Sequence, residues 1–266
     1  MLMQGKRGLI MGVANNHSIG WGIAQALAAQ GASLAFTYQG EALGKRVKPL
    51  AASLGSSLVL PCDVEDIATV DAAFDAIKAQ WGSLDFIVHS IGYSSKDELK
   101  GRYADTTRDN FIRTMVISVF SFTEVAKRAS GLMTAGGSML TLTFGGSTRV
   151  MPNYNVMGVA KAALEASMRY LAADFGPQGI RVNAISAGPV RTLAGAGITD
   201  ARFMFNFQKA HAPLRRNMTI EDCGGAALYL LSDLASGVTG EIHYVDGGYN
   251  IISMPHPADI KAEGEG

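Results

Sequence analysis

The sequence is poor in cysteine, in net charge and in long apolar runs. Its two cysteines, Cys62 and Cys223, lie far apart without metal-ligand spacing, and its five histidines have no such spacing either, so we expect buried thiols and no metal site. Basic and acidic residues number 23 each, which leaves no overall field to attract nucleic acid or an anionic membrane. Because no run of about 18 apolar residues offers a membrane span and no signal peptide opens the chain, we expect a cytoplasmic protein.

What the sequence does contain is a regular alternation of β-rich runs and helical patterns. With 266 residues and 48% hydrophobic content, it suits one large domain, which we place at residues 1–253, followed by a tail, 254–266, that we expect to be disordered. Strands separated by helices pair in parallel through right-handed crossovers. The sequence therefore predicts an α/β fold with a doubly wound, seven-stranded parallel sheet of Rossmann type, whose ligands bind beyond the carboxyl ends of the strands. The expected strands are Arg7–Met11, Ser33–Tyr38, Ser57–Leu60, Leu84–Ser90, Ser138–Thr143, Arg181–Ile185 and Glu241–Val245.

A tyrosine and a lysine seven residues apart, Tyr154 and Lys161, are the candidate catalytic pair. On a helix, this spacing is nearly two turns, so both side chains would leave the same face. A nearby ammonium favours the phenolate and lowers the pKa of a phenol from its ordinary value of about 10, so the pair would combine a tunable acid with a fixed cation. The alternative is a chance spacing on an amphipathic helix.

The turn after the first strand is glycine-rich and runs from Gly12 to Gly22. Gly12 permits close backbone approach, and Ser18 at the expected helix start could offer its hydroxyl and amide to a pyrophosphate. A plain strand-to-helix turn with a serine cap fits the same residues. Asp63 and Val64 follow the third strand and could bind adenine, whereas Ser90-Ile91-Gly92 follows the fourth and would place backbone against a ribose.

The end of the second strand indicates which dinucleotide is used. Gln39-Gly40-Glu41 contains no arginine or lysine that could pair with a 2′-phosphate, and Lys45 and Arg46 come a helical turn later. We therefore expect NAD as the cofactor, with NADH preferred over NADPH.

Five motifs together resemble the short-chain dehydrogenase/reductases and, more narrowly, the NADH-dependent enoyl-acyl-carrier-protein reductases of bacterial fatty-acid synthesis. The resemblance covers Gly5 to Asn250, and its motifs are Gly12-x5-Ser18-Ile19-Gly20-Trp21-Gly22, His89-Ser90-Ile91-Gly92, Tyr154-Asn155-Val156-Met157-Gly158-x-Ala160-Lys161, Arg181-Val182-Asn183-Ala184-Ile185-Ser186-Ala187-Gly188-Pro189 and Val245-Asp246-Gly247-Gly248.

This resemblance implies a reaction and a set of roles. The reaction would be reduction of the trans-2 double bond of an enoyl thioester on acyl carrier protein, with Tyr154 and Lys161 catalytic, Ser94 and Phe144 beside the substrate, and residues 193–209 as a lid over the acyl chain. It also implies a homotetramer. The cofactor contacts would be Gly12, Ser18, Ile19, Gln39, Asp63, Val64, Ile91, Lys161, Val190, Arg191, Thr192, Leu193 and Ala194.

One position departs from the pattern of many family members. They carry a second tyrosine ten residues before the catalytic one, where this chain has Phe144, as the mycobacterial branch does. Carbonyl-reducing relatives place a serine about thirteen residues before the tyrosine, where this chain has Thr141. A short-chain dehydrogenase acting on a carbonyl or alcohol, and a non-catalytic dinucleotide-binding protein, therefore remain alternatives.

Two further features have competing interpretations. His89 lies inside an apolar run, which favours a satisfied core histidine over a catalytic acid. Four basic residues near the expected lid form either a solvated face or a docking site for an acidic carrier protein: Arg202, Lys209, Arg215 and Arg216.

Overall fold

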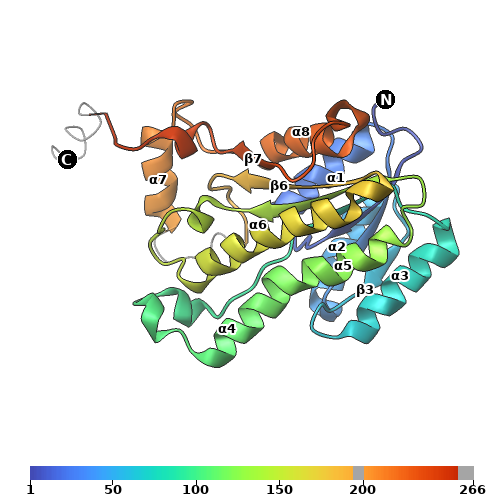
Figure 1. Cartoon of the computed structure of the whole chain (residues 1–266), viewed down its shortest axis with the longest axis horizontal. Helices are drawn as coiled ribbons and strands as arrows, with labels where there is room; N and C mark the ends of the chain where they lie inside the picture. The colour runs from blue at the N-terminus through green and yellow to red at the C-terminus, as the bar shows by residue number, and fades with distance from the viewer. Residues whose placement is uncertain (194–200, 257–266) are drawn as a thin grey trace.

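A parallel sheet of seven strands in the order β3-β2-β1-β4-β5-β6-β7 forms the centre of the molecule (Figure 1), which confirms the predicted fold class. The computed structural model describes residues 1–193 and 201–256. Its strands are β1 Arg7–Met11, β2 Ser33–Tyr38, β3 Val59–Pro61, β4 Phe86–His89, β5 Gly137–Thr143, β6 Ile180–Ala187 and β7 Ile242–Val245. Its helices are α1 Ile19–Ala29, α2 Gly40–Ser53, α3 Ile67–Trp81, α4 Arg108–Met115, α5 Ser121–Ser130, α6 Val156–Phe175, α7 Ala201–His211 and α8 Ile220–Leu231.

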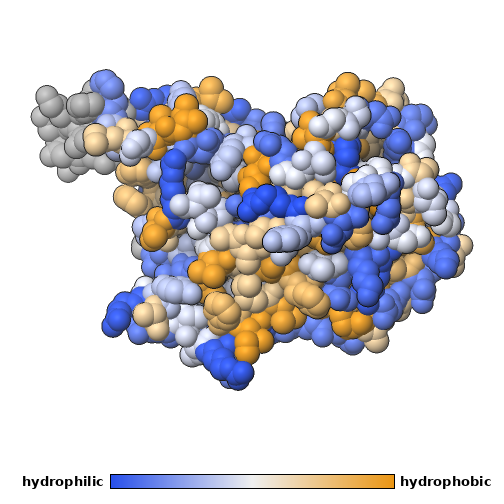
Figure 2. All heavy atoms as spheres, viewed as in Figure 1, coloured by the Kyte–Doolittle hydropathy of each residue, from blue (hydrophilic) through white to orange (hydrophobic). Residues whose placement is uncertain are grey.

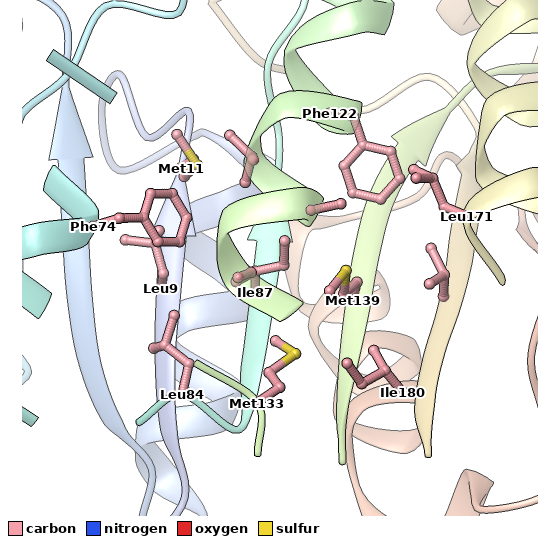
Figure 3. Close-up of a cluster of buried hydrophobic side chains, with 14 of the residues drawn as sticks. Leu9, Met11, Phe74, Leu84, Ile87, Phe122, Met133, Met139, Leu171 and Ile180 are labelled. Atoms are coloured by element: carbon pink, nitrogen blue, oxygen red, sulfur yellow. The ribbon is translucent and has the colours of Figure 1, made fainter. Parts of the chain in front are cut away.

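Two apolar layers hold helices against the two faces of the sheet. On one face, Leu9, Ile87 and Met139 meet the apolar stripes of α3, α5 and α6 (Figure 3). On the other, Ile10 and Leu140 meet α1, α2 and α8. Successive strand residues point to opposite faces, so a strand covered on both sides is buried throughout, as every residue of β4 is.

The strand order reverses between β1 and β4. Gly8 pairs with Leu34 of β2 on one side and with Phe86 of β4 on the other. The loops that follow β1 and β4 run very close together at this junction: a Cβ on Gly12 would overlap the carbonyl oxygen of Ser90. In sheets of this kind, the point of reversal opens a crevice beyond the carboxyl ends of the strands, and this crevice positions the site described below.

The predicted and observed elements differ in some of their bounds. The third strand begins two residues later and ends one residue later than the predicted Ser57–Leu60, and the fourth is shorter at both ends than the predicted Leu84–Ser90, since the ladder pairs only Val59–Pro61 and Phe86–His89. The residues from 108 to 130 do not form one continuous α-helix, because a π-helical turn, η3 Val116–Phe120, lies between α4 and α5. A π turn inserts a residue into a helix and frequently occurs at functional sites, and η3 contributes Ile117 to the cavity described below.

The buried cysteines and His89 are structural. Cys62 and Cys223 are free and buried, and burial raises their pKa values to about 11 and about 12. His89 is fully buried between the hydroxyls of Ser121 (2.8 Å) and Thr141 (3.3 Å), and burial lowers its pKa to about 3. The prediction of buried thiols and of a satisfied core histidine is thus confirmed.

None of the helices within residues 1–193 and 201–256 has the length and apolar character needed to cross a bilayer. The same residues bring no three His, Cys, Asp or Glu side chains together in an arrangement that could hold a metal ion.

Candidate active site

A cavity of about 860 Å³ opens at the carboxyl edge of the sheet, beside the β1–β4 junction. It brings together residues predicted from segments far apart in the sequence: Gly12, Ser18, Ile19, Gln39, Asp63, Val64, Ile91, Ser94, Phe144, Tyr154, Lys161, Val190, Thr192 and Leu193. Parallel strands deliver their loops to one edge, and this common edge is the reason that these segments meet.

One predicted cofactor contact among the described residues, Arg191, does not line the cavity. It is exposed, and its guanidinium lies 5.9 Å from the centre of the Phe205 ring. Ala194, also predicted as a cofactor contact, falls in 194–200, outside the described residues.

Tyr154 does not lie on the helix that carries Lys161, contrary to the spacing argument. Helix α6 begins at Val156, and Tyr154 sits in a tight turn before it, flanked by Asn153 (φ 56°) and Asn155 (φ 38°). Positive φ at two asparagines interrupts the helical backbone, which a pattern of residue types does not reveal. Both side chains still reach the same cavity.

The Tyr154 ring is held between aromatic and backbone surfaces. Phe144 meets it edge to face, with ring centroids 5.0 Å apart, and a Cβ on Gly146 would lie 2.5 Å from the Tyr154 ring. Tyr154 is buried, and burial raises the pKa of its hydroxyl well above the ordinary value of 10. Our expectation of an acidified phenol is therefore wrong for this structure: Tyr154 is a neutral hydrogen-bond donor.

Lys161 is fixed against the end of β5. Its Nζ donates to the carbonyl oxygen of Leu142 at 2.8 Å. Burial lowers the pKa of Lys161 to about 8, although the negative charge of Glu165, one helical turn further on, acts to raise it. Glu165 is itself buried and accepts a hydrogen bond from Thr143 Oγ1 at 2.5 Å. The last residues of β5 and the first turns of α6 are thus locked to each other around the site.

The glycine-rich turn before α1 is closed by Ser18. The Ser18 hydroxyl accepts from the backbone N–H groups of Ala14 (3.0 Å) and Asn15 (3.2 Å). It makes no cap to the helix that follows, and within this described segment no acidic side chain lies in the first turn of α1. The helix start therefore presents N–H groups and a positive dipole end, which suits an anionic ligand.

The part of the cavity beside the ends of β2 and β3 contains a carboxylate, that of Asp63. Gln39 Nε2 donates to Asp63 Oδ2 at 2.9 Å, which joins the ends of β2 and β3. Lys45 and Arg46 are exposed on α2 and do not line the cavity. A carboxylate in this position repels a 2′-phosphate and suits a ribose hydroxyl.

Sequence reasoning missed a bridge across the mouth of the cavity. Arg113 of α4 pairs with both carboxylate oxygens of Glu65, at 2.9 and 2.8 Å, and lies over the Tyr93 ring at 4.6 Å. All three line the cavity. Their separations of 20 to 48 residues gave no local signal, because only the folded sheet brings them together.

The loop containing Ser94, although polar in sequence, is held in place by hydrogen bonds. Ser95 N donates to Asn110 Oδ1 at 3.0 Å, and the Glu98 carboxylate accepts from Thr107 N at 2.9 Å, so the loop is bound to the start of α4. Leu99, in the short helix η1 Lys96–Leu99, is buried against Tyr154 and Met157.

Arg216, a member of the basic cluster, has an acidic partner. Arg216 pairs with Asp222 at 2.5 and 2.9 Å, and Asp222 completes the capping box of α8 with Thr219. This contact agrees with the interpretation of Arg216 as part of a solvated face.

Comparison with known proteins gives a consistent result over nearly the whole chain. A family model described as Enoyl-(Acyl carrier protein) reductase matches residues 12–250. The chain is 77% identical to enoyl-[acyl-carrier-protein] reductase [NADH] 2 of Rhizobium meliloti over 96% of its length and 95% of the relative, and 63% identical to the corresponding reductase 1 over 95% and 93%. Among solved structures, it resembles FabI from Candidatus Liberibacter asiaticus (TM-score 0.94, 60% identity, covering 96% of this chain and 99% of that one). It also resembles the enoyl reductase of Anaplasma phagocytophilum in complex with NAD (TM-score 0.93, 58% identity, covering 96% and 98%).

Proposed function

The chain belongs to the enoyl-(acyl-carrier-protein) reductases of the short-chain dehydrogenase/reductase superfamily, and from this membership we propose that it reduces the trans-2 double bond of enoyl thioesters on acyl carrier protein with NADH. The observation that carries the proposal is the presence of Tyr154 and Lys161 in one cavity at the carboxyl edge of the sheet. This is the final reductive step of the fatty-acid elongation cycle.

The residues around the cavity fit a dinucleotide. The uncapped start of α1 suits a pyrophosphate, and the hydrogen-bonded pair of Gln39 and Asp63 suits an adenosine ribose without a 2′-phosphate. Lys161 would bind the nicotinamide ribose, and Ile91 and Val190 would form apolar walls. When bound, NADH supplies the hydride that adds to the β-carbon of the enoyl thioester.

Tyr154 would stabilise the charge that hydride addition creates. As a neutral buried phenol, it donates a hydrogen bond to the thioester oxygen, on which negative charge accumulates as the double bond is reduced. Phe144 holds the Tyr154 ring edge to face and gives the site an apolar wall that excludes water. A proton added at the α-carbon completes the saturated product.

The proposal is tested by measuring NADH oxidation, from its absorbance, with trans-2-enoyl thioesters of acyl carrier protein as substrates. Parallel assays replace the substrate with 3-oxoacyl thioesters or the cofactor with NADPH. We expect turnover of the enoyl substrates with NADH. Faster turnover of 3-oxoacyl thioesters, or higher rates with NADPH at equal concentrations, would contradict the proposal.

The carbonyl-reducing alternative is disfavoured by the position of Thr141. Its hydroxyl lies within the sheet, 3.3 Å from both His89 Nδ1 and the His89 carbonyl oxygen, and Thr141 is fully buried away from the cavity. Thr141 therefore has no means of assisting Tyr154 on a ketone, in contrast to the serine of carbonyl reductases.

Helix α7 is proposed to cover the acyl chain, as part of the lid predicted at 193–209. Met204 and Phe205 face the cavity, and Gln208 anchors the helix by donating to the Asp246 carbonyl oxygen at 3.1 Å. Replacing Met204 with a larger Trp should shorten the preferred acyl chain. Unchanged kcat/KM values across a series of chain lengths would contradict the assignment.

We also propose a cytoplasmic homotetramer, which cell fractionation and light scattering would test. A tetramer with dihedral symmetry needs two separate self-complementary surfaces. Two candidate surfaces carry exposed apolar side chains: one over α4, α5 and α6, with Phe120 and Val159 (Figure 2), and one at the edge strand β7, with Tyr244.

A further inference from the structure

The backbone at Asn155 adopts a conformation that favours glycine. Tyr154 to Met157 form a turn closed by a hydrogen bond from Met157 N to the Tyr154 carbonyl oxygen at 2.9 Å, and Asn155, at φ 38° and ψ −120°, occupies its second position. These angles match a type II′ turn, in which glycine is the usual residue at that position. A side chain there strains the backbone and persists only where the surroundings impose this conformation.

The side chain of Asn155 provides a reason for its presence. Its Nδ2 faces three carbonyl oxygens of one loop, those of Glu98 (3.4 Å), Lys100 (3.4 Å) and Gly101 (3.3 Å). Glycine in this turn would relieve the backbone but leave these carbonyl oxygens without the amide. The strained residue therefore makes contacts that the relaxed residue cannot.

The loop bound by Asn155 forms one wall of the cavity. Ser94, Ser95, Lys96 and Leu99 all line it, and Leu99 is buried against Tyr154. The loop is also bound to the start of α4, at Ser95 by Asn110 and at Glu98 by Thr107. Asn155 thus connects the turn that carries the phenol to a loop that lines the same cavity.

We propose that Asn155 is a positioning residue for enoyl reduction: its turn directs Tyr154 into the cavity, and its amide holds the Ser94–Gly101 loop at a fixed distance from the phenol. The inference rests on the proposed function, because it assigns Asn155 to the geometry of that reaction. Displacing a reacting group by about 1 Å is sufficient to cost about 10²-fold in rate, so a modest release of the loop should be measurable.

Three variants separate backbone strain from the contact with the loop. Asn155→Gly relieves the turn and removes the amide; Asn155→Ala removes the amide without relieving the turn; Asn155→Asp keeps the shape but presents carboxylate oxygens to three carbonyl oxygens. Each is assayed for melting temperature, Kd for NADH, and kcat and KM with an enoyl thioester.

We expect Asn155→Gly to melt at or above the wild-type temperature and to bind NADH within about twofold of wild type, yet to lose about 10- to 100-fold in kcat. Asn155→Asp should lose at least as much. Wild-type kcat in Asn155→Gly would overturn the inference, as would losses of kcat that track losses of stability across all three variants. Failure of the proposed function is distinct, because the wild-type protein would then not oxidise NADH with enoyl thioesters.

Discussion

At the scale of single residues, burial gives Tyr154 its chemical character. The Tyr154→Phe variant should keep its affinity for NADH but lose about 10²- to 10⁴-fold in kcat, because it lacks the donor to the thioester oxygen. Stopped-flow and steady-state assays measure the loss, and fluorescence titration measures the affinity. The matched control is Tyr170→Phe, an exposed tyrosine on α6, the helix that follows Tyr154. Equal turnover in Tyr154→Phe and wild type would exclude Tyr154 from the reaction.

Lys161 should make cofactor binding depend on pH. Burial lowers its pKa from 10.5 to about 8, so the ammonium is lost as the pH rises through about 8, and NADH affinity should fall over the same interval. The charge of Glu165 opposes this lowering, so Glu165→Gln should move the transition to lower pH.

Fluorescence titration of NADH across this pH range tests both statements, with Lys161→Met as the control that should bind weakly and show no transition. An NADH affinity that is independent of pH in the wild-type protein, or a transition that does not move in Glu165→Gln, would contradict the role assigned to the Lys161 charge.

At the scale of secondary-structure elements, α1 and α8 pack backbone to backbone through two glycines. A Cβ on Gly22 would overlap the Ile220 carbonyl, and one on Gly224 would lie 2.7 Å from the Gly22 carbonyl oxygen. Gly224→Ala should therefore separate the helices and destabilise the fold by about 1–3 kcal/mol.

The next residue of α8 provides the control for this prediction. A Cβ on Gly225 would meet nothing within 4 Å, so Gly225→Ala should stabilise the helix by about 0.5–1 kcal/mol. Thermal and urea unfolding measure both changes. A Gly224→Ala protein as stable as Gly225→Ala would show that the contact between the helices yields easily.

The order of the elements was predictable because their periodicity is strong, but the local backbone of the site was not. Val70, Phe74 and Ile77 recur at helical spacing and are all buried, so this apolar pattern predicts α3 from the sequence alone. The turn at Asn155 depends instead on contacts with residues more than fifty positions earlier. The same reason explains why Tyr154 was wrongly placed on a helix and why the Glu65–Arg113 bridge was missed.

At the scale of the whole molecule, two apolar surfaces should control assembly. Phe120 is 52% exposed on one surface and Tyr244 is 42% exposed on the other. Phe120→Glu and Tyr244→Glu should each convert the tetramer that we propose to dimers, and the double variant should be monomeric, because each charge would be buried without a partner.

Size-exclusion chromatography with light scattering measures these masses, with Ile67→Lys on α3 as an exposed apolar control outside both surfaces. A wild-type monomer, or a Phe120→Glu tetramer, would contradict the assembly that we propose.

The central position of β1 has a further consequence for biosynthesis. It is translated before the other strands of the sheet, yet one of its edges is closed only when Phe86–His89 has been translated, and the apolar face above it stays open until α5 and α6 arrive. The nascent chain must therefore carry a strand that is apolar from Gly8 to Met11, with an unpaired edge, through much of translation, which is the circumstance in which growing polypeptides associate wrongly or recruit chaperones.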